Sequence, residues 1–133
     1  MRRQLQEHTA RQLLHAAQTA RRRAYAPYSR FRVGAAVLAV DGSVYTGCNV
    51  ENGSYGLSVC AERVAVQKAV SEGRRRVLAV AVAGPGAMEL LPCGACRQVL
   101  LEFRTRFVVT VGRGRLRIYR LEELLPQAFL RPR

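Results

Sequence analysis

Apolar residues follow helical spacing near the start of the chain and strand-like spacing soon after it. Residues 5–23 place apolar side chains at helical intervals with polar ones between them, which predicts an amphipathic helix. Pro27 ends this pattern, because proline cannot continue a helix. Residues 33–40 and 43–50 then flank Asp41-Gly42, a dipeptide typical of a two-residue hairpin turn. The first fifty residues therefore predict a helix followed by a β-hairpin.

The rest of the chain alternates between helical and strand patterns. Residues 60–71 predict a helix ended by Gly73, and residues 77–83 predict an apolar strand that is buried on both faces. The remaining predicted elements are a helix at 93–103, strands at 107–111 and 116–119, and a closing helix at 121–129. The order α-β-β-α-β-α-β-β-α predicts an α/β fold, a three-layer α/β/α sandwich around a mixed five-stranded sheet.

Length and composition indicate one globular domain over residues 1–133. The chain is 49% hydrophobic and 23% charged, which is ordinary for a packed domain and unlike a disordered one. Its apolar stretches are far shorter than the roughly 20 residues that span a bilayer, and no apolar signal-peptide core follows Met1. We therefore expect a cytoplasmic protein without a membrane partner. In that reducing compartment, four cysteines favour metal binding or catalysis over disulfides.

The chain is strongly basic, and the charge fits two interpretations. Its formal net charge is +13, from 22 basic and 9 acidic residues, and Lys68 is the only lysine. Such a balance is typical of nucleic-acid binding, but it also fits a solvated, arginine-rich surface. The arginine runs at 21–23 and 74–76 lie near predicted helix ends, where cations complement the helix dipole. That position favours the solvated surface, and we do not expect a nucleic-acid partner.

Three cysteines have the spacing of a metal site. Cys60 begins one predicted helix, and Cys93 and Cys96 begin another. Helix N-termini favour the thiolate form that metals bind, and three ligands leave the fourth tetrahedral position of a zinc ion open, as in catalytic sites. A structural zinc site would need a fourth ligand. Cys48 lies in an alternating strand and is typical of a small buried residue, so we predict one catalytic Zn²⁺ per chain.

A carboxylate and two arginines accompany these cysteines. Glu62 falls two residues after Cys60, in the first helical turn, where it could exchange protons at the open position without binding the metal. A non-ligand glutamate followed by P-C-x-x-C is the known signature of zinc nucleobase deaminases. The assignment of Glu62 as the proton-exchanging group rests on its match to that signature. Arg63, and less strongly Arg97, could donate to a thiolate and offset the negative charge of three sulfurs.

Four sequence blocks carry a resemblance to a known family: YAPYSRFRVGAA at 25–36, TGCNVENGSYGLSVCAERVA at 46–65, PCGACRQVLLEF at 92–103 and LEELLPQAF at 121–129. Nearly the whole chain resembles the small homotetrameric zinc-dependent cytidine deaminases that act on free nucleosides. The resemblance implies hydrolytic deamination of cytidine and deoxycytidine to uridine and deoxyuridine in pyrimidine salvage. It also implies that Cys60, Cys93 and Cys96 bind zinc and that Glu62 is the proton shuttle.

The same resemblance implies residues that contact the substrate. Asn49 and Glu51 are the expected partners of the ribose hydroxyls, a role that suits an amide beside a carboxylate. Phe31 is expected to pack against the pyrimidine, and Ala61 is expected to line the substrate site.

Further contacts implied by the resemblance involve a neighbouring subunit. Phe129 and Tyr55 are expected to reach the site of another chain in a homotetramer, and Gln98 is expected to support the metal ligands. Two positions depart from the family's pattern without removing a functional group. Leu91 precedes Pro92 where a small or hydroxyl residue is common, and Gly53 replaces a more usual alanine.

Two alternatives remain open from the sequence. A deaminase of another aminopyrimidine nucleoside, such as blasticidin S, would share the zinc and glutamate motifs, although the Asn49 and Glu51 pair argues against it. A basic, zinc-stabilised nucleic-acid-binding module would explain the arginines but would give Glu62 no role. A polynucleotide deaminase typically needs additional loops for a flipped base, for which 133 residues leave little room.

Overall fold

The computed structural model describes residues 4–86 and 88–132, and the predicted order of elements is confirmed there. The helices are α1 (Glu7–Ala20), α2 (Ala61–Ser71), α3 (Gly94–Glu102) and α4 (Leu121–Leu124), with 3₁₀ turns η1 (Arg21–Arg23) and η2 (Tyr55–Leu57). The strands are β1 (Gly34–Ala39), β2 (Val44–Cys48), β3 (Val77–Ala83), β4 (Phe107–Gly112) and β5 (Arg115–Arg120). Within the described residues, no helix is both long enough and apolar enough to cross a membrane.

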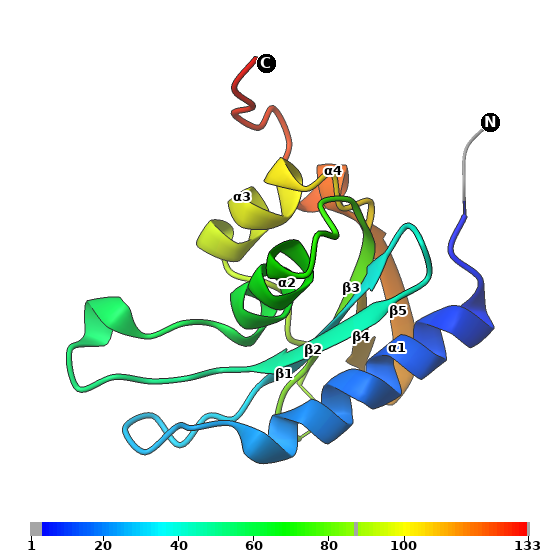
Figure 1. Ribbon diagram of the computed structural model, residues 1–133. Helices are drawn as coiled ribbons and strands as arrows, with labels where there is room; N and C mark the ends of the chain where they lie inside the picture. The colour runs from blue at the N-terminus through cyan, green and yellow to red at the C-terminus, as the bar shows by residue number, and fades with distance from the viewer. Residues whose placement is uncertain (1–3, 87, 133) are drawn as a thin grey trace.

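The strands of the described chain form one mixed sheet between two helical layers, which confirms the predicted sandwich. Their order is β2-β1-β3-β4-β5, and β3 pairs with β4 in parallel while the other neighbours are antiparallel. Helix α1 lies across one face of the sheet, and α2, α3 and α4 lie on the opposite face (Figure 1). The parallel pair is joined through α3, as a crossover connection requires.

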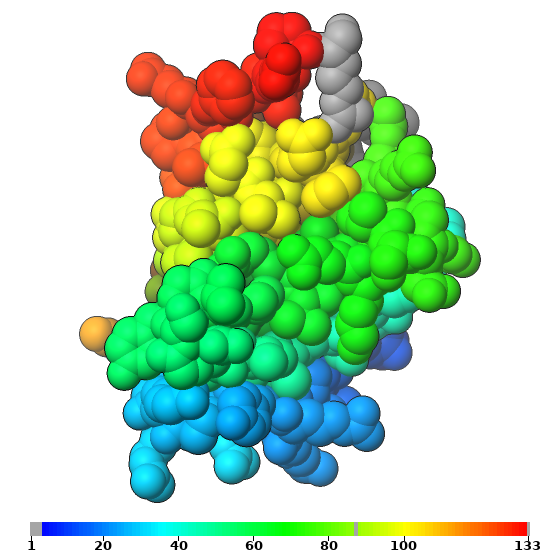
Figure 2. Space-filling model, turned by 60° about the vertical axis from the view of Figure 1, so that its left-hand side comes forward, coloured from blue at the N-terminus to red at the C-terminus, as the bar shows by residue number. Residues whose placement is uncertain are grey.

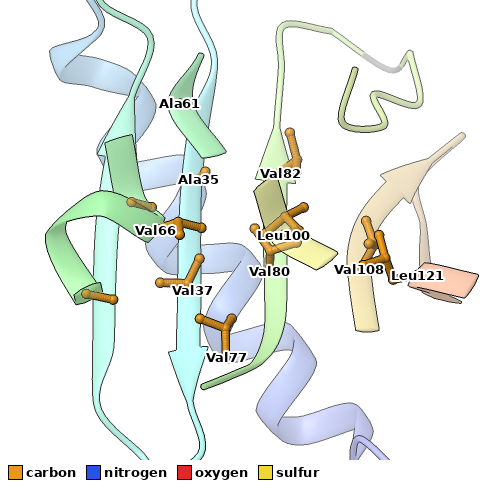
Figure 3. Close-up of a cluster of buried hydrophobic side chains, with 12 residues drawn as sticks. Ala35, Val37, Ala61, Val66, Val77, Val80, Val82, Leu100, Val108 and Leu121 are labelled. Atoms are coloured by element: carbon orange, nitrogen blue, oxygen red, sulfur yellow. The ribbon is translucent and has the colours of Figure 1, made fainter. Parts of the chain in front are cut away.

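Alternating side chains of the strands fill a separate core on each face. Under α1, Ala36 and Ala81 pack with Leu13 and Ala17 of the helix. The other core lies beneath α2 and α3 (Figure 3). Its buried members include Ala35, Val37, Val66, Val77, Val80, Val82, Leu100, Val108 and Leu121. The central strands β1, β3 and β4 are therefore buried on both sides, which agrees with their nearly continuous apolar sequences, whereas the edge strands β2 and β5 are partly exposed.

The closing helix is shorter than predicted. It ends at Leu124, whereas the sequence pattern predicted a helix over residues 121–129. Leu125 has φ −141° and ψ 68°, because the residue before a proline is disfavoured in the helical region and Pro126 cannot continue a helix. The chain after Pro126 is thereby released from helical geometry, and this C-terminal segment extends beyond α4 (Figure 1).

The hairpin between β1 and β2 is confirmed, but its turn is longer than two residues. The N–H of Ala39 donates to the carbonyl of Ser43, and the N–H of Gly42 donates back to the carbonyl of Ala39. Gly42 has φ +95°, while Asp41 is not among the described residues with positive φ. A two-residue Asp-Gly turn would need positive φ at both positions, so the glycine here closes a three-residue loop.

One end of the sheet carries all the connections that form the candidate site. The loop before β1 and the loop after β2 project beyond the sheet at this end (Figure 1). Figure 2 shows these loops side by side, the first in blue and the second in blue-green, and a bridge between Tyr25 and Val50 joins them. Helices α2 and α3 both begin at this end, so their N-termini face the same space.

Candidate active site

Three cysteine sulfurs converge where α2 and α3 begin. Cys60 is the residue before α2, Cys93 is the residue before α3, and Cys96 is in the first turn of α3. Their sulfur atoms all lie within 4.8 Å of one another. Cys48 does not belong to this group, and all four cysteines are free of disulfides. The structure thus brings together the three ligands expected from the sequence.

The donor set fits a zinc ion. Zinc prefers sulfur and nitrogen ligands, with Zn–S bonds of about 2.3 Å, and three sulfurs this close together can share one ion. The N–H of Cys96 also donates to the sulfur of Cys93 at 3.5 Å, which fixes the turn between these two ligands. Three sulfurs without a fourth protein donor in the described group leave one coordination position open, as in catalytic sites.

The electrostatics of the cluster already favour a thiolate. A hydrogen bond from the Cys96 thiol, assisted by the nearby Arg63 guanidinium, lowers the pKa of Cys60 to about 5. The same contact with Cys60, together with burial, raises the pKa of Cys96. The two sulfurs therefore hold one proton between them, and a metal that replaces this proton would bind both as thiolates.

Glu62 lies beside this cluster in the first turn of α2. It is only 5% exposed, and it lines the same cleft as Cys60 and Cys93. Burial is the main reason that its pKa is raised to about 7, and the negative charge of Cys60 adds to the effect. A carboxyl group with a pKa near neutrality can both accept and release a proton, which general acid–base catalysis requires.

The two candidate arginines have different environments. An Nη2 atom of Arg63 lies 3.6 Å from the sulfur of Cys60, and its buried Nε has no hydrogen-bond partner among the described residues. Arg97 instead donates to the carbonyl oxygens of Pro92 and Leu124, each at 2.7 Å. Arg63 is thus placed to offset the thiolate charge, whereas Arg97 joins the start of α3 to α4.

A cleft of about 320 Å³ contains most of the predicted substrate residues. Its described lining consists of Ser29, Phe31, Val33, Asn49, Glu51, Cys60, Ala61, Glu62, Leu90, Leu91 and Cys93. A larger hollow of about 490 Å³ beside α1 is lined by apolar and neutral side chains and the glycine of the hairpin turn. Chemistry rather than size therefore identifies the site.

Asn49 and Glu51 are tied to the neighbouring loop of the same chain. The Asn49 side chain donates to the carbonyl of Phe31 at 2.8 Å and accepts from the N–H of Val33 at 2.9 Å. Glu51 accepts the N–H groups of Tyr28 and Ser29 and the hydroxyl of Ser29. The hydroxyl of Ser29 is the main reason that the pKa of Glu51 is lowered. Both residues thus shape the cleft and line it.

The remaining predicted residues lie outside the described lining of the cleft. Tyr55 and Phe129 are 77% and 72% exposed, and the ring of Tyr55 contacts only the edge of Tyr28 among the described aromatic residues. Gln98 donates to the carbonyl of Phe129 at 2.9 Å, so it holds the C-terminal segment. The roles of Tyr55 and Phe129 in substrate binding, and of Gln98 in supporting the metal ligands, remain predictions.

Sequence reasoning missed some residues of the cleft. Ser29 and Val33 belong to the block at 25–36 that carries the family resemblance, and the block could have indicated them. Leu90 lies in a segment without a motif, and it is held by Thr110, whose hydroxyl donates to its carbonyl at 2.9 Å. That contact joins residues 20 positions apart, so no local pattern reveals it.

Comparisons with known proteins agree with this site. The family model described as "Cytidine and deoxycytidylate deaminase zinc-binding region" matches residues 7–111. A cytidine deaminase of Halalkalibacterium halodurans is 51% identical over 120 residues, which cover 88% of this chain and 91% of the relative. The crystal structure of a cytidine deaminase from Burkholderia pseudomallei superposes with a TM-score of 0.84 at 46% identity, covering 94% of this chain and all of the other. The crystal structure of a cytidine deaminase from Mycobacterium tuberculosis superposes with a TM-score of 0.78 at 50% identity, covering 90% of this chain and 95% of the other.

We expect Cys93→Ala to lose zinc, because two thiolates cannot hold the ion as tightly as three. Metal analysis of the purified protein measures the loss. Cys48→Ala is the matched control and should retain one zinc per chain, since Cys48 lies outside the sulfur cluster. Full zinc content in a stable Cys93→Ala protein would show that the ligand set is wrong.

Arg63→Gln should raise the pKa of Cys60 in the zinc-free protein, because the neutral amide no longer stabilises the thiolate. The thiolate absorbance measured against pH should therefore appear at higher pH than in the wild type. Arg22→Gln, which removes an exposed arginine elsewhere, should leave the titration unchanged. Superimposable curves for Arg63→Gln and the wild type would remove Arg63 from the site.

Proposed function

This chain belongs to the cytidine and deoxycytidylate deaminase family and is a zinc-dependent cytidine-deaminating enzyme, and we propose that Glu62 carries its proton transfers. The reaction replaces the 4-amino group of cytidine or deoxycytidine with oxygen from water and releases ammonia. The observation that supports this assignment is the buried Glu62 carboxyl, with its pKa raised to about 7, beside three converging cysteines. A structural zinc site would give such a carboxyl no function.

Each group at the floor of the cleft has a distinct role. Cys60, Cys93 and Cys96 would hold the zinc ion, which supplies Lewis-acid activation of a water molecule. Glu62 would accept the two protons of that water in turn and deliver one to the ring nitrogen and the other to the departing amine, which leaves as ammonia. One carboxyl group can serve both directions because its pKa lies close to neutral pH. Arg63 adds to the effect of Cys96 in lowering the pKa of Cys60 and so favours its charged form.

The walls of the cleft suit a pyrimidine nucleoside. Phe31 offers apolar surface for the base, the buried Ala61 lies behind the floor of the cleft, and Asn49 and Glu51 offer polar atoms for the ribose. The Asn49 amide retains one N–H and one lone pair beyond its two loop contacts, so it can still donate and accept. The proposed substrates are therefore free nucleosides, and the proposed role is pyrimidine salvage. The proposed compartment is the cytoplasm, where the thiols stay reduced.

The proposed assembly is a homotetramer in which neighbouring chains complete each site. Tyr55 and Phe129 are large aromatic side chains that are mostly exposed in the single chain, although aromatic surface favours burial. A closed, dry site strengthens the electrostatic interactions of the reaction, and symmetric assemblies allow each chain to cover its neighbour's cleft. Both rings lie on segments that extend beyond the sheet.

Glu62→Gln should abolish turnover of cytidine while zinc stays bound, because the amide keeps the shape but cannot exchange the proton. We expect a loss of at least about 10⁴-fold in kcat, at the upper end for a general acid–base group, measured by the ultraviolet absorbance change on deamination. Glu72→Gln, an exposed change at the other end of α2, should retain the wild-type rate. A Glu62→Gln protein that retains more than a tenth of the wild-type rate would refute the role of Glu62 in proton transfer. A wild-type protein that deaminates blasticidin S but not cytidine would refute cytidine as the substrate.

Phe129→Ala should raise the KM for cytidine roughly two- to tenfold without loss of zinc, because an aromatic contact contributes about 0.5–1.5 kcal/mol. Leu130→Ala is the matched control, since it removes the neighbouring exposed apolar side chain. Light scattering of the wild type should give the mass of four chains. A fully active monomer with normal cytidine affinity would show that one chain completes the site.

A further inference from the structure

The hydroxyl of Ser29 lies between the two sides of the cleft. It donates to the carboxylate of Glu51, and the same oxygen accepts the N–H of Phe31 at 3.0 Å. A serine hydroxyl can do both at once because it has one donor hydrogen and two acceptor lone pairs. One atom of Ser29 thus joins the residue proposed for the sugar to the residue proposed for the base.

The contacts of Phe31 make this connection stronger. Its N–H is held by Ser29, and its carbonyl accepts from the side-chain amide of Asn49 at 2.8 Å. Asn49 therefore binds the carbonyl of Phe31 directly, and Glu51 is linked to the N–H of Phe31 through the Ser29 hydroxyl. Asn49 and Glu51 are the pair proposed to bind the ribose. The position of the aromatic ring depends on the same hydrogen bonds that orient Asn49 and Glu51.

The contacts of Glu51 limit what it can still bind. A carboxylate has about four acceptor positions. In this chain the N–H of Tyr28, the N–H of Ser29 and the hydroxyl of Ser29 occupy three of them. One position remains for a donor in the cleft, which Glu51 lines. That geometry suits a single sugar hydroxyl and requires the loop to hold the carboxylate in place.

We propose that Ser29 is a positioning residue that orients Glu51 toward a ribose hydroxyl and couples that contact to the placement of Phe31 against the base. This inference rests on the proposed function. Without the hydroxyl, the carboxylate and the loop must be ordered during substrate binding, and the cost of ordering appears as weaker binding. The proton transfers at Glu62 do not involve Ser29, so the chemical step itself should be preserved.

The test compares Ser29→Ala and Ser29→Thr with the wild type in cytidine deamination. We expect Ser29→Ala to raise KM roughly tenfold, in line with the loss of a hydrogen bond to a charged group, while kcat changes less than about twofold. Ser29→Thr retains the hydroxyl and should restore most of the affinity. Ser43→Ala is the matched control, because Ser43 also donates to a carboxylate, that of Asp41 in the distant hairpin turn. It should leave KM unchanged.

A double-mutant cycle tests the coupling through Glu51. Because Ser29 acts on this carboxylate, Ser29→Ala should raise KM much less in a Glu51→Gln background than in the wild type. The inference would be overturned if Ser29→Ala left KM unchanged, if it lowered kcat instead, or if it raised KM equally in the wild-type and Glu51→Gln backgrounds. Each of these results would leave the proposed function intact. If wild-type protein does not deaminate cytidine, the proposed function fails. The same cycle measured by thermal unfolding then shows whether Ser29 and Glu51 are coupled, and additive changes would reject the contact.

Discussion

The convergence of two helix N-termini at one end of the sheet is the constraint on which the site depends. Helix α3 follows β3 and connects it to the parallel strand β4, and α2 packs on the same face, so both helices start at the same edge. Each start presents free N–H groups and the positive end of a helix dipole, which stabilise thiolates. Three sulfurs within 4.8 Å cannot all carry negative charge without a cation, and the opposite pKa shifts of Cys60 and Cys96 show this conflict. A bound zinc ion resolves it.

The same convergence determines the environment of Glu62. The residue follows Cys60 by two positions, so the first turn of α2 buries its carboxyl beside the sulfur cluster. Burial and the neighbouring negative charge both disfavour the ionised form and bring its pKa to about 7. The helix start therefore provides, within three residues, a cysteine of the sulfur cluster and a carboxyl group that can exchange protons near neutral pH. Hydrogen bonds of Ser29 and Asn49 join the loops around the cleft, on which the proposed recognition of sugar and base depends.

Much of this arrangement could be predicted from the sequence, because its signals are local. The apolar runs predicted the order of helices and strands, and cysteine and glutamate spacing at predicted helix starts indicated the zinc site and its acid–base group. Contacts between distant segments could not be predicted in this way. The bonds of Arg97 to the carbonyls of Pro92 and Leu124, and of Ser29 to Glu51, depend on which loops meet in space. Pro126 indicates the early end of α4, and the helix predicted over residues 121–129 is too long because the apolar pattern beyond the proline is not helical.

A zinc titration with cytidine as substrate shows whether the three cysteines and Glu62 form a zinc-dependent deamination site. Purified protein is stripped with a chelator, zinc is returned in steps, and bound metal and the rate of uridine formation are measured on the same samples. We expect no deamination without metal and a rate that rises in proportion to bound zinc, with saturation at one ion per chain. Deamination that persists in the zinc-free protein, or a fully loaded protein that leaves cytidine unchanged, would contradict this expectation.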